Sequence, residues 1–298
     1  MSTVEKAAEK LKALPLDSDV PPSVEAKLDS TGSTVERLQE RSHTADRPAE
    51  STALCRVDPS ALKRMGVLPA DIEAERRLAD ELRRVKRPLL NNAVGKGAEA
   101  FARGMRIVVT SAEAGEGKTF TAVNLALSLA READFEVLLV DGDIPKADVT
   151  RTFGLGGKPG LMDVLADEHR APAEVIVRTD VPNLLVVPAG EHNPLAAELF
   201  RSRRMEYVLE ELGGHNRRRL LLFDSSPLLA TSESQVLVSH MGQVVMVVAA
   251  ARTRRQAVNT ALQSLNEFQY VGLVLNMSRL PAGENYYDSS YERYSQAR

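Results

Sequence analysis

The stretch Ile-Val-Val-Thr-Ser-Ala-Glu-Ala-Gly-Glu-Gly-Lys-Thr occupies residues 107–119 and decides the fold. A short β-branched run, Ile107–Val109, leads into a glycine-containing turn, and a helical pattern follows over Thr119–Ala130. A strand, a glycine-rich loop ending in Gly-Lys-Thr and a helix form the Walker A pattern in its required setting. Ala112 stands where the strict pattern has its first glycine.

The residue types in this loop suit phosphate binding. Gly115 and Gly117 allow backbone N–H groups to turn toward an anion, and the helix that follows directs its positive end at the same anion. Lys118 can reach the β- and γ-phosphates, and the Thr119 hydroxyl can ligate Mg²⁺. We therefore expect Mg-ATP to bind here, on Gly115, Glu116, Gly117, Lys118, Thr119 and Phe120.

The remaining apolar runs predict an α/β protein with the P-loop NTPase fold. They are continuous rather than alternating, which is typical of parallel strands that are covered by helices on both faces. Helical stretches such as 119–130 and 254–268 supply the connections between strands. The expected strands are Ile107–Val109, Val137–Val140, Leu184–Val187, Leu220–Phe223, Val244–Val248 and Leu273–Leu275.

Three aspartates follow two of these strands. Asp141 and Asp143 come after Val137–Val140, and Asp224 comes after Leu220–Phe223. Because parallel strands end at one edge of a sheet, the three carboxylates should meet beside the phosphates. The sequence therefore predicts a metal site at this edge.

The chain divides into three parts by composition. Residues 1–67 are polar and rich in Ser, Thr and Pro, and are expected to be a largely disordered extension. Residues 68–275 form the P-loop domain, including a charged helix at 69–87 that Pro88 should end. Residues 276–298 lose the apolar pattern and should be a flexible tail.

Charge and composition narrow the partners. The net charge is −3 and the sequence pI is about 6.0, so no nucleic acid is expected as a partner. Cys55 is the single cysteine, and neither a signal peptide nor a membrane span is recognised, which favours a cytoplasmic protein.

Together, these segments resemble the bacterial tyrosine kinases (BY-kinases) that control exopolysaccharide and capsule synthesis. The resemblance covers about residues 72–298 and rests on 112–119, on Leu138–Asp143, on Leu220–Pro227 and on a tyrosine-rich C-terminus. It implies that Lys118 and Asp141 are catalytic, with Asp141 accepting the tyrosine proton. It also implies that Thr119, Asp143 and Asp224 hold the metal and that Asn276 contacts adenine.

The resemblance extends to assembly and regulation. Glu81, Arg84 and Arg87 share one helical face, and in this family such a stretch joins subunits into a ring. Neighbouring subunits then phosphorylate one another's tails, a switch that a tyrosine phosphatase reverses. The family also implies an integral membrane polysaccharide co-polymerase as activator, at the inner face of the plasma membrane. Residues 68–90 resemble the subgroup associated with exosortase-type loci. The expected phosphoacceptors are Tyr286, Tyr287, Tyr291 and Tyr294.

Two positions depart from the family pattern, and the first of them keeps a scaffold without kinase activity open. Pro145 stands where the family often has arginine, with Lys146 next, and Ser226 replaces a proline whose loss is expected to matter little. Glu113 stands where partition-type ATPases carry a signature lysine, which points away from them. The alternatives are a partition- or division-site-type ATPase switch, and a nucleotide-binding scaffold without kinase activity.

Overall fold

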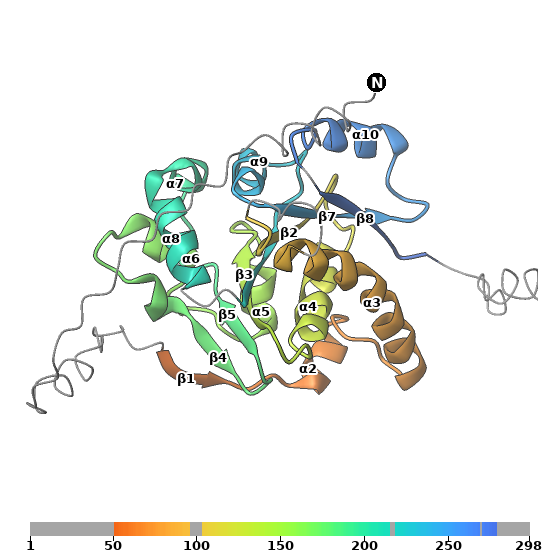
Figure 1. The fold of residues 1–298 in the computed structure, drawn as a ribbon, viewed down its shortest axis with the longest axis horizontal. Helices are drawn as coiled ribbons and strands as arrows, with labels where there is room; N and C mark the ends of the chain where they lie inside the picture. The colour runs from red at the N-terminus through yellow and green to blue at the C-terminus, as the bar shows by residue number, and fades with distance from the viewer. Residues whose placement is uncertain (1–50, 96–102, 215–217, 269, 279–298) are drawn as a thin grey trace, which may run out of the picture. The chain divides into compact units, whose positions relative to one another are not determined.

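The computed structural model describes residues 51–95, 103–214, 218–268 and 270–278 (Figure 1). All described residues belong to the second of two units of the chain, Pro48–Arg298. Of the predicted disordered extension 1–67 and the predicted flexible tail 276–298, residues 1–50 and 279–298 lie outside the described residues.

An eight-stranded sheet forms the centre of this second unit, in the order β1-β4-β5-β3-β6-β2-β7-β8. The pairings from β5 to β8 are all parallel, whereas β4 runs antiparallel to β5 and β1 runs parallel to β4. The predicted mostly parallel sheet is confirmed. The strands are β1 Ser51–Cys55, β2 Arg106–Ser111, β3 Glu136–Gly142, β4 Val177–Thr179, β5 Leu184–Val187, β6 Arg219–Ser225, β7 Gln243–Ala249 and β8 Val271–Asn276.

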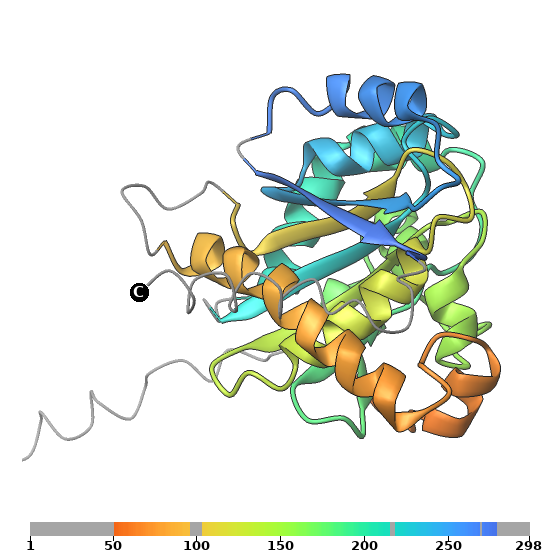
Figure 2. The same ribbon diagram turned by 90° about the vertical axis from the view of Figure 1, so that its right-hand side faces the viewer.

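Helices cover both faces of the sheet, as Figures 1 and 2 show. One face carries α2 Pro59–Arg64, α3 Ile72–Val94, α4 Lys118–Leu129 and α5 Asp148–Thr152. The other carries α6 Leu161–Ala166, the short 3₁₀ helix η1 Pro172–Val175, α7 Ala196–Arg201, α8 Arg203–Gly213, α9 Ser232–Ser239 and α10 Arg255–Gln263.

Alternate residues of each central strand supply the two cores. Ile107 and Val109 of β2 pack with α3 and α4, whereas Val108, between them, packs with the helices of the opposite face. Every β2 residue from Ile107 onward is buried, because helices lie on both sides of it. This explains why the central strands appear in the sequence as unbroken apolar runs.

The expected boundary at residue 68 differs from the structure. Both β1 and α2 fall within 1–67, and the carbonyl of Cys55 accepts the N–H of Asp180 in the segment after β4. The sequence gives only a weak signal for β1, because this segment becomes a strand by pairing with β4 rather than through its own residue pattern. At the other end, Asn276 is the last residue of β8 rather than the start of the tail.

The first long helix also differs from its prediction of 69–87. It runs from Ile72 to Val94 and continues through Pro88. Leu89 is fully buried, its carbonyl accepts the Gln243 side chain at 3.0 Å, and Asn92 donates to the same glutamine at 2.9 Å. These contacts with the start of β7 compensate for the hydrogen bond that a proline removes inside a helix.

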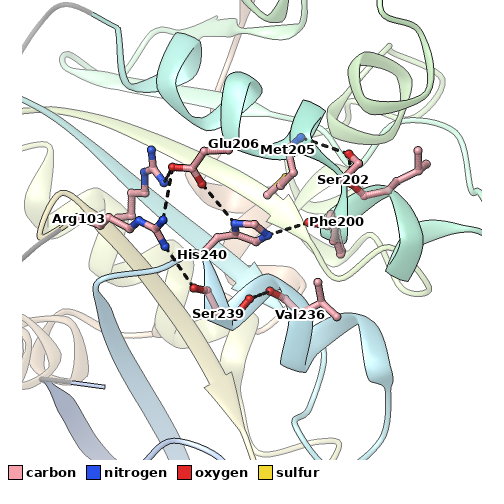
Figure 3. A network of polar contacts seen from close by, with 10 residues as sticks. Arg103, Phe200, Ser202, Met205, Glu206, Val236, Ser239 and His240 are labelled. Atoms are coloured by element: carbon pink, nitrogen blue, oxygen red, sulfur yellow. Dashed lines mark hydrogen bonds and ion pairs between the residues drawn. The ribbon is translucent and has the colours of Figure 1, made fainter. Parts of the chain in front are cut away.

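The edge strand β8 is less covered than predicted. Leu273 and Leu275 are 56% and 64% exposed, so one face of β8 lies beyond the reach of α10. Elsewhere, a polar network joins Arg103, just before β2, to Glu206 of α8 and Ser239 of α9, as Figure 3 shows. Glu206 of α8 binds Arg106 at 2.8 Å, and the ring of His240 lies between Glu206 and the carbonyl of Phe200. No helix in the described segments is long and apolar enough to cross a membrane.

Candidate nucleotide-binding and catalytic site

The phosphate-binding loop lies between β2 and α4, as predicted. Gly115 and Gly117 have φ angles of +80° and +91°, which residues with a Cβ rarely adopt. The first residue of α4 is Lys118, and no side chain caps this helix, so its N-terminal amides face the loop. The methyl group of Ala112 is fully buried in the core, which accounts for alanine at the position of the first glycine.

The metal-site residues predicted from the sequence lie at the edge where β3 and β6 end. Asp141 and Asp224 are opposite one another in the register of these two strands. The hydroxyl of Thr119, on the first turn of α4, donates to Asp224 Oδ2 at 2.6 Å. Asp143 is 2% exposed, and its Oδ1 accepts the hydroxyl of Ser226 at 2.7 Å.

One oxygen of each of these aspartates is buried without a hydrogen-bond partner among the described residues: Asp141 Oδ1, Asp143 Oδ2 and Asp224 Oδ1. Burial raises the pKa of Asp224 well above its usual value, although the Thr119 hydroxyl opposes this. The buried oxygens of Asp143 and Asp224 that lack donors suit a hard cation such as Mg²⁺, which also takes phosphate and water oxygens. The described side chains contain no ready-made cluster of three His, Cys, Asp or Glu ligands, so Thr119 and phosphate would complete the coordination.

Asp141 is held by a residue that the sequence analysis did not single out. Its Oδ2 accepts the N–H of Thr150 at 2.7 Å and the Thr150 hydroxyl at 2.6 Å, and that hydroxyl accepts the N–H of Ala189 at 2.9 Å. Burial raises the pKa of Asp141 from 3.8 to about 6, against the effect of these hydrogen bonds, and nearby Asp143 adds to the rise. A carboxylate with this pKa is ionised near neutral pH and still attracts a proton.

Asn276 lies against the loop from the end of β8. Its amide donates to the carbonyl of Glu116 at 2.9 Å, and a Cβ on Gly117 would come within 2.0 Å of the same nitrogen. The side chain of Glu116 is buried and binds other parts of the protein, which leaves its backbone to face a nucleotide. Phe120 is partly buried in the first turn of α4.

The remaining predicted residues lie elsewhere. Glu81, Arg84 and Arg87 are exposed on α3, whose opposite face buries Leu82 and Leu89. The four C-terminal tyrosines are outside the described residues. Lys146 is exposed in the turn after Asp143, and Pro145 beside it is exposed too.

Sequence reasoning missed Thr150 and Thr253, and it underrated Ser226. Their hydroxyl groups contact residues that lie from 9 to 137 positions away, and no local pattern reveals such pairs. Ser226 replaces a proline of the family pattern, and a proline could not donate to Asp143.

Comparison with known proteins places this geometry in a family. Residues 104–274 match the family described as AAA domain. The tyrosine-protein kinase CpsD of Streptococcus agalactiae is 30% identical over 173 residues, which are 57% of this chain and 74% of that protein. EpsB of Ralstonia nicotianae is 32% identical over 195 residues, which are 63% of this chain but only 25% of EpsB.

A solved structure of a tyrosine kinase domain is also similar to this chain. The kinase domain of the Escherichia coli tyrosine kinase ETK has a TM-score of 0.54 and 26% identity to this chain. The match covers 61% of this chain and 70% of that domain.

Proposed function

Because this chain belongs to the AAA-domain family and, within it, to the bacterial tyrosine kinases, we propose that it transfers the γ-phosphoryl group of ATP to tyrosine side chains. One observation carries the kinase assignment beyond nucleotide binding. Asp141 lies at the P-loop edge of the sheet with one oxygen fixed by Thr150 and the other without a hydrogen-bond partner. That arrangement suits a base that removes a proton from an incoming hydroxyl.

Residues of the loop and the strand ends bind and neutralise the triphosphate. The amides from Gly115 to Thr119 and the ammonium of Lys118 take the phosphate oxygens, as in other P-loop proteins. Thr119, Asp143 and Asp224 would hold Mg²⁺, which would supply positive charge against the charge that develops on the transferred phosphate. The Asn276 amide, fixed by the Glu116 carbonyl, contacts the adenine.

Asp141 then acts on the acceptor. A phenol with a pKa near 10 is a poor nucleophile at neutral pH, so removal of its proton during attack speeds the transfer. With a pKa of about 6, Asp141 is mostly ionised at pH 7.5 and can take that proton. Its Oδ2 stays hydrogen-bonded to Thr150, so Oδ1 is the oxygen that receives it.

The acceptors are the tail residues Tyr286, Tyr287, Tyr291 and Tyr294, phosphorylated between subunits of a ring. The exposed face of α3 with Glu81, Arg84 and Arg87 joins the subunits. Phosphate groups add negative charge to tails that already contain Asp288 and Glu292, and the resulting repulsion favours dissociation.

The setting is exopolysaccharide synthesis or export. An integral membrane co-polymerase activates the kinase at the inner face of the plasma membrane, and a tyrosine phosphatase resets the tails. The chain spans about a quarter of EpsB.

Peptide mass spectrometry after incubation with Mg-ATP and a membrane activator tests the activity. We expect stepwise phosphate addition on the four tail tyrosines, and none in Lys118→Met. The control is Tyr207→Phe, which removes an exposed tyrosine of α8 and should leave the tail pattern unchanged. Absence of phosphotyrosine, combined with ATP-driven dimerisation, would replace the kinase assignment with a nucleotide switch.

Mixing two variants tests transfer between subunits. Lys118→Met keeps the acceptors but lacks activity, and a variant with the four tail tyrosines changed to phenylalanine keeps activity but lacks acceptors. Phosphate should appear on the Lys118→Met tail in the mixture, at a rate that rises with concentration. No phosphate in the mixture, when the wild type is phosphorylated, would show that each chain modifies only itself.

A further inference from the structure

Glu116 is an acidic side chain buried inside the phosphate-binding loop. It is 2% exposed, and it lies next to Gly117 and Lys118, where a triphosphate would bring further negative charge. Burying a carboxylate is costly unless hydrogen bonds compensate it. Hydrogen bonds to the Glu116 carboxylate must therefore compensate for its burial in this loop.

Three donors converge on this carboxylate. Oε2 accepts the N–H of Glu113 at 2.6 Å, which closes the loop across three residues. Oε1 accepts the hydroxyl of Thr253 and, at 3.4 Å, the N–H of Ala249 at the end of β7. The Thr253 hydroxyl also accepts the Ala249 N–H at 3.1 Å, so the turn after β7 is closed around the same group.

A second strand holds the backbone of the same residue. The carbonyl of Glu116 accepts the amide of Asn276 at the end of β8. The side chain thus ties the loop to β7 and the main chain ties it to β8. These contacts are made by groups of the protein alone, so they can hold the loop in shape independently of a bound phosphate.

Resting on the proposed nucleotide-binding function, we propose that Glu116 is a positioning residue that sets nucleotide affinity by fixing the loop to the ends of β7 and β8. Its side chain does not touch the nucleotide itself. Both of its oxygens are occupied by donors from the protein, and a carboxylate would repel a phosphate at contact distance. A loop fixed in advance loses less conformational freedom on binding, which appears as affinity.

A positioning role for Glu116 predicts that its loss changes KM for ATP rather than kcat. Weakening the attachment should raise KM for ATP and leave kcat at saturating ATP nearly unchanged, because Lys118 and Asp141 are untouched. Thr253→Val removes one donor and keeps the shape of the side chain. Glu116→Ala removes the acceptor of all three donors.

The measurement is fluorescence titration of the full chain with mant-ADP and Mg²⁺, which does not depend on kinase activity. We expect Glu116→Ala to weaken binding by about tenfold or more and Thr253→Val by about threefold to tenfold, as for loss of hydrogen bonds to a charged group. The controls are Glu198→Ala and Thr260→Val, the same chemical changes at exposed positions of α7 and α10, and both should bind within about twofold of the wild type.

A double variant sharpens the test. If Glu116 acts through Thr253, combining Glu116→Ala with Thr253→Val should weaken binding no further than Glu116→Ala alone. Thermal unfolding identifies a variant that fails to fold, in which case Thr253→Val alone decides. Unchanged mant-ADP affinity in folded variants, or a lower kcat with an unchanged KM, would overturn the proposal. If the wild type formed no phosphotyrosine, the kinase assignment would be contradicted, but the mant-ADP titration would still test the role of Glu116.

Discussion

Replacing Asp141 with asparagine should stabilise the nucleotide-free protein at pH 7.5 while it removes the proposed base. Asp141 is fully buried, and its ionised form sits beside Asp143 and Asp224 with one oxygen lacking a donor. The usual pKa of 3.8 rises to about 6, chiefly because burial disfavours the charged form. The native state therefore holds a proton on this group more tightly than the unfolded state does.

The sign of the pH dependence follows. Stability from this group is greatest below about pH 4, where both states are protonated, and falls as pH rises toward 6 because the unfolded state ionises first. Above pH 6 the full difference applies, about two pKa units or roughly 3 kcal/mol. The asparagine NH₂ has no acceptor at the Oδ1 position, which costs about 1–2 kcal/mol. A net gain of about 1–2 kcal/mol should raise Tm by roughly 2–8 °C in a domain of this size.

Thermal unfolding in EDTA without nucleotide measures this effect. Asp141→Asn should unfold at higher temperature than the wild type at pH 7.5, and the difference should shrink or reverse at pH 5.0, where Asp141 is mostly protonated. Asp134→Asn is the matched control, since its carboxylate is exposed and Tm should change little at either pH. A destabilised Asp141→Asn at pH 7.5, or a gain that is the same at both pH values, would refute the reasoning.

Three further changes probe other parts of the structure. Gly117→Ala should weaken mant-ADP binding by at least about tenfold, because a φ of +91° and a Cβ 2.0 Å from the Asn276 amide together cost about 2–3 kcal/mol; binding within twofold of wild type would contradict this. Thr150→Val should lower kcat by about tenfold at unchanged mant-ADP affinity, because Asp141 loses one of its two donors, and Thr150→Ser should restore the rate. His240→Ala should lower Tm by a few degrees without affecting mant-ADP affinity, because its ring contacts join α8 and α9 away from the loop (Figure 3); a change in affinity would show that this network reaches the nucleotide site.

The central sheet was predictable because its strands are buried on both faces. A strand such as Val244–Val248 appears as an unbroken apolar run, and the P-loop after Ile107–Val109 fixes its direction. The outer strands carry no such signal. Three residues of β4 and the polar start of β1 become strands only through pairing with each other and with β5.

Local rules also fail where tertiary contacts outweigh them. A proline disfavours helix before it, yet α3 continues past Pro88 because Leu89 is buried and Gln243 binds both the Leu89 carbonyl and Asn92. A sum of small local preferences cannot anticipate a partner more than 150 residues away.

The candidate site divides in the same way. The three aspartates were predictable, because strand ends of a parallel sheet meet at one edge. The residues that orient the site, Thr150 in α5 and Thr253 in the turn after β7, were not, because the hydroxyl of a threonine usually binds the backbone nearby. The loop pattern predicts Glu116 as a nucleotide-binding residue, and the burial of its side chain, which the sequence does not reveal, is what leads us to propose a positioning role for that side chain.

The pairing of β1 with β4 has a practical consequence for shortening this protein. A chain that begins at residue 68 would keep the whole P-loop and all three aspartates, but it would lose β1 and the Cys55–Asp180 backbone bond. One side of β4 would then present unpaired N–H and C=O groups to solvent. Such an edge recruits strands from other molecules. The shortened protein should therefore self-associate and precipitate more readily than one that begins before Ser51.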